Sequence, residues 1–121
     1  GHYSQALAAH ARGDWAAANA QLRSFVEEFF DQVVETIAPG PYSSSHQRRQ
    51  ALAKVGFFRS DLNEWSDDGT GFVQSFWKRL HPQGSHPGLS EKEDSTFRLH
   101  IVIVVMHYFA KRLESLLIKK N

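Results

Sequence analysis

The order of apolar and polar positions along the chain predicts helices rather than strands. Beginning at Trp15, apolar residues recur at steps of three and four, which is the pattern of one face of an α-helix. These positions are Ala18, Leu22, Phe25, Val26, Phe29, Val33 and Ile37. Asp14 can cap the start of this helix, and the sequence PGP at 39–41 ends it, because proline removes backbone donors.

Three shorter segments have helical composition. SQALAAHARGD at 4–14 is rich in alanine and predicts a first helix that ends at Gly13. SSSHQRRQALAKVGFF at 43–58 offers serines as caps and predicts a helix over about residues 46–55. FVQSFWKRL at 72–80 is apolar on one helical face, and Pro82 prevents its continuation.

The last segment predicts a long helix that starts at Ser90. Glu93 follows this serine by three residues, which is the spacing of a capping box. The stretch FRLHIVIVV alternates as a buried strand would, but its length favours a helix. Its apolar positions, Phe97, Ile101, Val104, Tyr108, Leu113 and Leu117, continue into the tail, and its middle is apolar on all sides, as in the buried centre of a bundle. We therefore expect an all-α fold, a four- to five-helix up-and-down bundle.

Size and composition indicate one domain over residues 1–121. Hydrophobic residues make up 41% of the chain, enough for a sizeable core. The opening Gly1-His2 is typical of a cleaved expression tag, so the domain can be a piece excised from a longer protein.

Charge and cysteine content exclude several classes of site. With 14 Lys+Arg against 13 Asp+Glu, the net charge of +1 gives no global argument for a nucleic acid or a membrane. The absence of cysteine excludes disulfides, thiolate metal sites and cysteine nucleophiles. The apolar run IVIVVM at 101–106 is too short to span a bilayer. We expect a soluble, cytoplasmic protein without a cofactor, a metal or a membrane partner.

The most informative stretch for function is RLHPQGSHPGLSEKED at 79–94, which separates two predicted helices. Arg79 lies near the end of one helix and His86 just ahead of the next. A forked guanidinium suits a phosphate, and a histidine can move a proton near neutral pH. RNA cleavage without a metal needs these two functions. Arg79 as a surface cation that stabilises a helix C-terminus is an equally good interpretation of the same residue.

Residues 70–117, and the stretch RLHPQGSHPGLSEKEDSTFRLHIVIVVMHYFAKRL in particular, resemble the HEPN superfamily and the carboxy-terminal portion of abortive-infection proteins. The resemblance implies a compact helical domain of a bacterial defence or toxin–antitoxin system, with Arg79 and His86 as paired catalytic residues. It also implies a homodimer with a composite site, and control by an antitoxin or a neighbouring domain.

Further residues are candidates for binding the RNA substrate: Lys78, His81, Arg98 and His100. His100 and His107 lie seven residues apart on one helical face, where they could line a groove or place a second cation near a bound phosphate. The alternative is that they are partly buried and hydrogen-bonded to neighbouring helices. Zinc held by His81, His86 and His100 lacks a recognised ligand spacing.

Basic residues at 48, 49, 54 and 59 can attract an RNA backbone if they share one side, or can form an ordinary solvated face.

Two functions therefore remain open. One is a HEPN-like, metal-independent endoribonuclease. The other is a catalytically silent helical module that dimerises or docks onto another chain through an exposed apolar surface.

Overall fold

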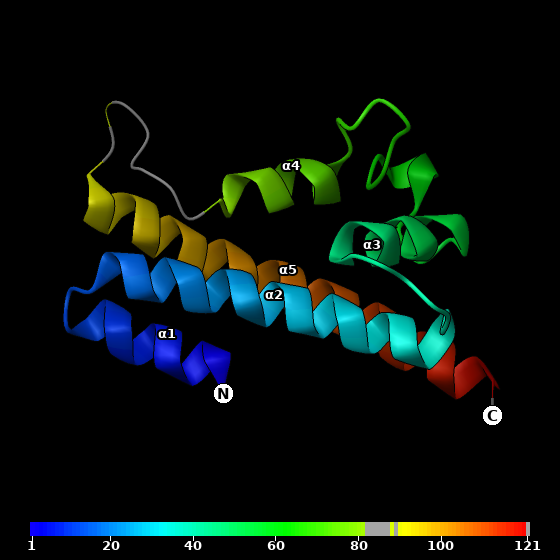
Figure 1. Cartoon of the computed structure of the whole chain (residues 1–121), viewed down its shortest axis with the longest axis horizontal. Helices are drawn as coiled ribbons and strands as arrows, with labels where there is room; N and C mark the ends of the chain where they lie inside the picture. The colour runs from blue at the N-terminus through cyan, green and yellow to red at the C-terminus, as the bar shows by residue number, and fades with distance from the viewer. Residues whose placement is uncertain (82–87, 89, 121) are drawn as a thin grey trace. The chain divides into compact units, whose positions relative to one another are not determined.

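The computed structural model describes residues 1–81, 88 and 90–120, and within these residues it contains helices and no strand. The α-helices are α1 (His2–Ala11), α2 (Trp15–Ile37), α3 (Ser45–Lys54), α4 (Phe72–Arg79) and α5 (Glu91–Lys120), and a 3₁₀ turn, η1, covers Ser60–Leu62 (Figure 1). The predicted all-α fold is confirmed, and the alternative of a strand near residues 97–105 is wrong. The chain divides into a first unit, Gly1–Val26 with Pro82–Asn121, and a second unit, Glu27–His81.

Short polar side chains begin three of these helices, as the sequence predicts. The backbone N–H of Ala17 donates to Asp14 Oδ1 at 3.2 Å, at the start of α2. Ser44 Oγ accepts from Gln47 N at 3.1 Å, and Ser90 Oγ accepts from Glu93 N at 3.1 Å. Each contact satisfies a backbone donor that the first helical turn leaves open.

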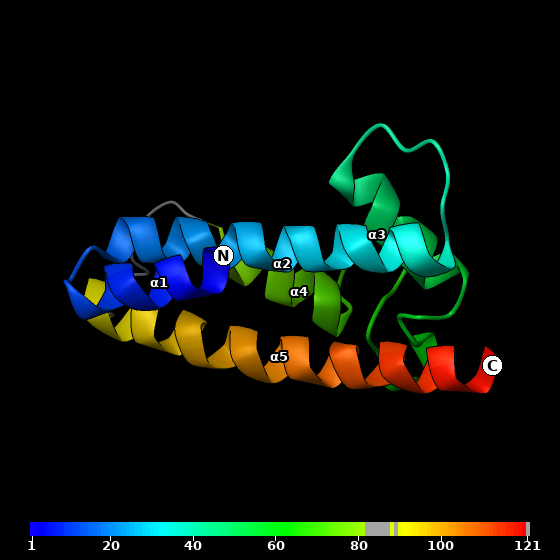
Figure 2. The same ribbon diagram turned by 90° about the horizontal axis from the view of Figure 1, so that it is seen from below.

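In the first unit, α1 contacts both the first half of α2 and the beginning of α5. Gly13 adopts a φ of +78°, which lets the chain reverse between α1 and α2. The ring centroids of Tyr3 and Phe25 then lie 5.5 Å apart. His10 Nε2 lies 3.0 Å from Thr96 Oγ1 on α5. α1 therefore lies beside both longer helices, and Figure 2 shows it between them.

The side of α5 that is buried differs from the prediction. Its buried apolar residues are Leu99, Val102, Val105, Met106 and Phe109. The predicted core positions Phe97, Val104 and Tyr108 are 45%, 62% and 45% exposed. The expectation that the middle of this helix is buried all round is therefore wrong. Because that stretch is apolar on every side, its periodicity alone does not select the face that packs inward.

In the second unit, aromatic side chains form much of the interior. Phe30 on α2 meets Phe58 edge-on, with centroids 5.2 Å apart and an interplanar angle of 90°. Trp65 stacks on Phe58 at 5.7 Å and 12°. Offset-stacked and edge-to-face pairs add to the energy of apolar burial. The buried apolar residues of this unit are Phe30, Val33, Val34, Leu52, Phe57, Phe58, Val73, Phe76 and Leu80.

One glutamine orders the loop that leads into α4. Gln74 Oε1 accepts from the backbone N–H of Ser66 at 3.0 Å and of Gly71 at 2.9 Å, while its Nε2 donates to Ser66 O at 2.9 Å. A Cβ added at Gly71 would lie 2.5 Å from Trp65 Cα, so only glycine fits this close approach. The loop is thereby held against the start of α4.

In the part of the chain that the structure describes, no helix combines the length and the apolar character needed to cross a membrane.

Candidate functional site

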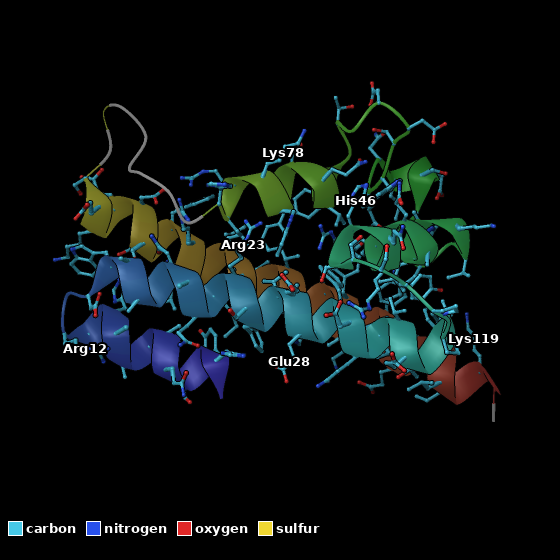
Figure 3. All side chains as sticks on the ribbon, viewed as in Figure 1. Arg12, Arg23, Glu28, His46, Lys78 and Lys119 are labelled. Atoms are coloured by element: carbon cyan, nitrogen blue, oxygen red, sulfur yellow. The ribbon has the colours of Figure 1, made fainter. Side chains whose placement is uncertain are left out.

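The end of α4 carries the first half of the predicted catalytic pair. Arg79 is the last residue of α4 and is half-buried. Lys78 before it and His81 after it are both exposed, and Lys78 extends outward from α4 (Figure 3). A helix C-terminus carries partial negative charge, which favours the positive charges of Lys78 and Arg79. His86, the second half of the pair, lies outside the described residues.

The start of α5 contains a buried ion pair. Arg98 Nε lies 2.8 Å from Asp94 Oδ2, one helical turn away. The two residues are 1% and 2% exposed, and Ser95 between them is also buried. Arg98 is thus held by Asp94 and is shielded from solvent. Its predicted contact with a substrate phosphate stays a prediction, and it requires this pair to open.

The remaining predicted ligand on α5, His100, is exposed, and so is His107. The alternative interpretation of these histidines as partly buried side chains is therefore wrong. They lie on the side of α5 opposite to Val102, Val105 and Phe109.

The arginines of the second unit interact with side chains of that unit. Arg59 forms a forked pair with Asp61, Nη2 to Oδ2 at 2.6 Å and Nε to Oδ1 at 3.1 Å. Arg48 Nη1 lies 3.7 Å from Asp31 Oδ2. Burial raises the pKa of Asp31, and the charge of Arg48 partly offsets this rise.

Arg49 is the least exposed of these arginines, at 7%. Its Cζ lies 4.4 Å from the centroid of the Trp77 ring, which is a cation–π arrangement. Three of the four basic residues that the sequence groups as an RNA-attracting face therefore have partners within the unit. Lys54, the fourth, is exposed.

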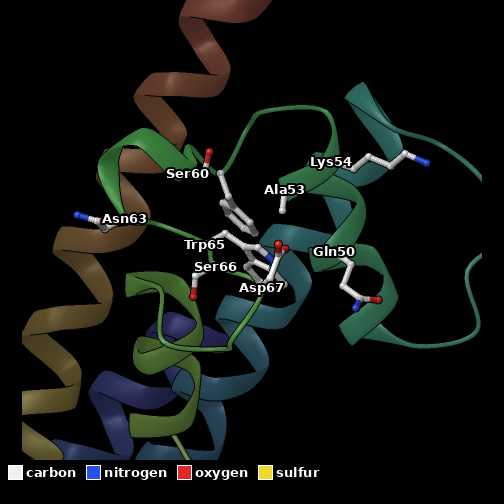
Figure 4. Close-up of a pocket in the computed structure, with 9 residues that line it drawn as sticks. Gln50, Ala53, Lys54, Ser60, Asn63, Trp65, Ser66 and Asp67 are labelled. Carbon is white, nitrogen blue, oxygen red and sulfur yellow. The ribbon is translucent and has the colours of Figure 1, made fainter.

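A pocket of about 620 Å³ in the second unit was not anticipated from the sequence (Figure 4). Its lining residues are Gln50, Ala53, Lys54, Phe58, Ser60, Asn63, Trp65, Ser66 and Asp67. The stacked rings of Phe58 and Trp65 give it an aromatic surface, and amide, hydroxyl and charged groups surround them. Three separate stretches of chain contribute to this lining, so no local motif announces the pocket.

Next to the pocket, a tight cluster of hydrogen bonds fixes Asp68. Its Oδ1 accepts from Ser66 Oγ at 2.6 Å, from Thr70 Oγ1 at 2.6 Å and from Thr70 N at 3.1 Å. The hydrogen bonds from Ser66, followed by those from Thr70, lower the pKa of Asp68 to about 2. These hydrogen bonds order the polar loop between Ser66 and Thr70.

No group of three or more histidine and carboxylate side chains placed to hold a metal ion occurs among residues 1–81, 88 and 90–120.

Comparison with known proteins gives no family. No protein-family model matches the chain, and no curated protein or solved structure matches it significantly. The chemistry of its own residues is therefore the basis for any functional proposal.

Proposed function

We propose that the chain is a HEPN-like, metal-independent endoribonuclease domain of a bacterial defence or toxin system, in which Arg79 and His86 form the catalytic pair. The observation that carries this proposal is the cationic end of α4, where Lys78, Arg79 and His81 follow one another within four positions.

The proposed reaction needs no metal and no cofactor. His86 takes the proton of a ribose 2′-hydroxyl, and the 2′ oxygen forms a bond to the adjacent phosphorus. The bond from phosphorus to the 5′ oxygen breaks, and that oxygen takes a proton from the imidazolium. The products are a 2′,3′-cyclic phosphate and a 5′-hydroxyl. Arg79 stabilises the charge that develops on the phosphoryl oxygens.

The exposure of three side chains supports the proposed contacts with the substrate. Lys78 and His81 are exposed beside Arg79 and can meet neighbouring phosphates. His100 is exposed on α5. Arg98 contributes to this site only after its pair with Asp94 opens.

The experiment is an RNA-cleavage assay with the purified chain in the presence of excess chelator. We expect cleavage that yields 2′,3′-cyclic phosphate ends and a loss of about 100-fold or more in His86→Ala, which is the usual contribution of a proton-transfer group. Arg79→Lys keeps the charge but not the fork and is expected to lose most of the activity.

His46→Ala is the matched control, because His46 is an exposed histidine of α3 with no proposed catalytic role. Its activity and helical circular dichroism are expected to equal those of the unmodified chain. Full cleavage by a folded His86→Ala chain would remove His86 from the mechanism.

A second candidate function is a catalytically silent module that dimerises or docks onto another protein. The observation that favours it is the apolar surface of α5. Of the ten large hydrophobic side chains that are exposed in the described part of the chain, six lie on this helix. Exposed apolar groups gathered on one element commonly mark an interaction site. A folded chain that cuts no RNA and self-associates would support this function.

A further inference from the structure

The outward side of α5 carries two rows of exposed residues with a seven-residue period. One row consists of Phe97, Val104, Lys111 and Ile118. The other consists of Glu93, His100, His107 and Glu114. All eight residues are exposed, including Val104 at 62% and Ile118 at 67%.

These rows have the spacing of a coiled-coil seam. They alternate at steps of four and three, so they form one continuous stripe along the helix. Val102, Val105 and Phe109, at 0%, 3% and 0% exposure, lie on the opposite side and pack into the first unit. α5 is thus apolar on its inward side and again, in part, on its outward stripe.

We propose that this stripe binds a second copy of the chain, with the two α5 helices antiparallel and crossing at the level of residue 102. In this register Phe97 faces His107 of the partner copy, and Val104 faces the partner copy's His100. Lys111 faces the partner copy's Glu93. A two-fold axis makes each of these contacts occur twice, as in an isologous dimer.

The charges on the stripe select both the occupant and its direction. Glu93 lies nine positions before residue 102, and Lys111 lies nine positions after it. When one copy is reversed, each glutamate therefore meets a lysine of the other copy, at both ends of the contact. A parallel dimer in register would instead place Lys111 against Lys111 and Glu93 against Glu93, which is unfavourable. In the single chain, Lys111 Nζ lies 3.5 Å from Glu114 Oε2, and both side chains are about 60% exposed. Such an exposed pair is weak and exchanges easily for a contact with a partner.

This inference deepens the second candidate function by naming the partner and the contact surface, and it does not depend on ribonuclease activity. It also gives His100 a contact with the partner copy in place of a contact with RNA.

The experiment measures self-association of the purified chain by sedimentation equilibrium across a concentration series. We expect a monomer–dimer equilibrium. Lys111→Glu and Glu93→Lys each place like charges at both ends of the stripe and are expected to raise the dissociation constant about tenfold or more. The double variant Glu93→Lys with Lys111→Glu restores opposite charges and is expected to return the constant to within about threefold.

Lys92→Glu is the matched control, because it makes the same charge change at an exposed position of α5 outside the stripe. We expect no more than about a twofold effect. Val104→Glu places a charge at the centre of the stripe and is expected to give a monomer with unchanged helical circular dichroism.

Two outcomes would overturn the proposal. One is a chain that stays monomeric at every concentration. The other is a dimer that the single charge reversals leave intact, or that the double variant fails to restore. Because the measurement uses no RNA, its failure leaves the ribonuclease proposal standing, and an absence of RNA cleavage leaves the dimer standing.

Discussion

Asp94 and Arg98 form an ion pair inside the first unit, with 2.8 Å between Oδ2 and Nε and less than 3% of either residue exposed. Burying two charges on folding has a large desolvation free energy. Their mutual attraction offsets it only while both charges are present. Removing one partner leaves the other charge buried.

We therefore expect Arg98→Met to lower the free energy of unfolding by about 3 kcal/mol or more, measured by denaturant titration. Arg112→Met provides the control. Arg112 is a half-buried arginine of the same helix that lies over the Tyr108 ring at 4.9 Å, and its loss is expected to cost about 1 kcal/mol. Equal effects of the two substitutions would contradict a special role for the buried pair.

Arg49 and Trp77 provide a second test. Since the guanidinium lies 4.4 Å from the ring centroid and is largely buried, its planar shape is part of the contact. Arg49→Lys keeps the charge but loses the stacking, so we expect a loss of about 1 to 2 kcal/mol in thermal unfolding. Arg48→Lys, at the longer 3.7 Å pair with Asp31, should change stability by less than about 0.5 kcal/mol. A reversed order of the two effects would show that the ring contact contributes little.

A substitution at Gln74 tests how much the hydrogen bond from its Nε2 to Ser66 O contributes to stability. Gln74→Glu keeps the acceptor for Ser66 N and Gly71 N but turns the donor to Ser66 O into a second acceptor. We expect a loss of about 2 kcal/mol in the free energy of unfolding. Gln47 on α3 is the control, because its side-chain oxygen accepts from Ser43 N at 2.8 Å, and Gln47→Glu preserves that contact. This control is expected to be neutral or slightly stabilising, since an acidic group near a helix N-terminus is favoured.

The hydrogen bonds of Asp68 predict that the stability of the fold depends on pH. Its pKa of about 2 in the folded chain lies below the ordinary 3.8, because Ser66 and Thr70 donate to the ionised carboxylate. A depressed pKa stabilises the fold above the unfolded value, and this contribution is lost as the pH falls from about 4 through about 2. Titration of the Asp68 carboxyl carbon by NMR should give a midpoint near 2, and Ser66→Ala should move it upward. A midpoint near 3.8 in the unmodified chain would show that these hydrogen bonds do not hold the charge.

The helices could be predicted from the sequence because their signals are local. The stripe that starts at Trp15 predicts α2, which spans Trp15–Ile37, and Asp14, Ser44 and Ser90 act as the caps that their positions indicate. The rotation of α5 could not be predicted. Phe97 and Arg98 are adjacent, yet the apolar residue is 45% exposed and the charged one 1% exposed. Tertiary packing decides which side of α5 is buried. The carboxylate of Asp94 makes this burial possible, because it compensates the charge of Arg98.

The candidate site also has features that the sequence predicts and features that it does not. Lys78, Arg79 and His81 lie at the end of α4, where the sequence puts them, because a helix end is a local feature. The partners of Arg48 and Arg49 depend on contacts made by folding, and the pocket beside Trp65 depends on three separate stretches of chain. No spacing rule along the sequence reports such contacts.

The pairing of the arginines in the second unit has a consequence for ionic strength. Arg48, Arg49 and Arg59 already have partners, so a nucleic acid that meets this unit would release few counterions from its backbone. The exposed cations Lys54 and Lys78, together with Arg79, would give a slope of about −2 in a double-logarithmic plot of affinity against salt for a single strand. Binding of RNA through this unit should therefore persist at salt concentrations that release proteins with broad basic surfaces.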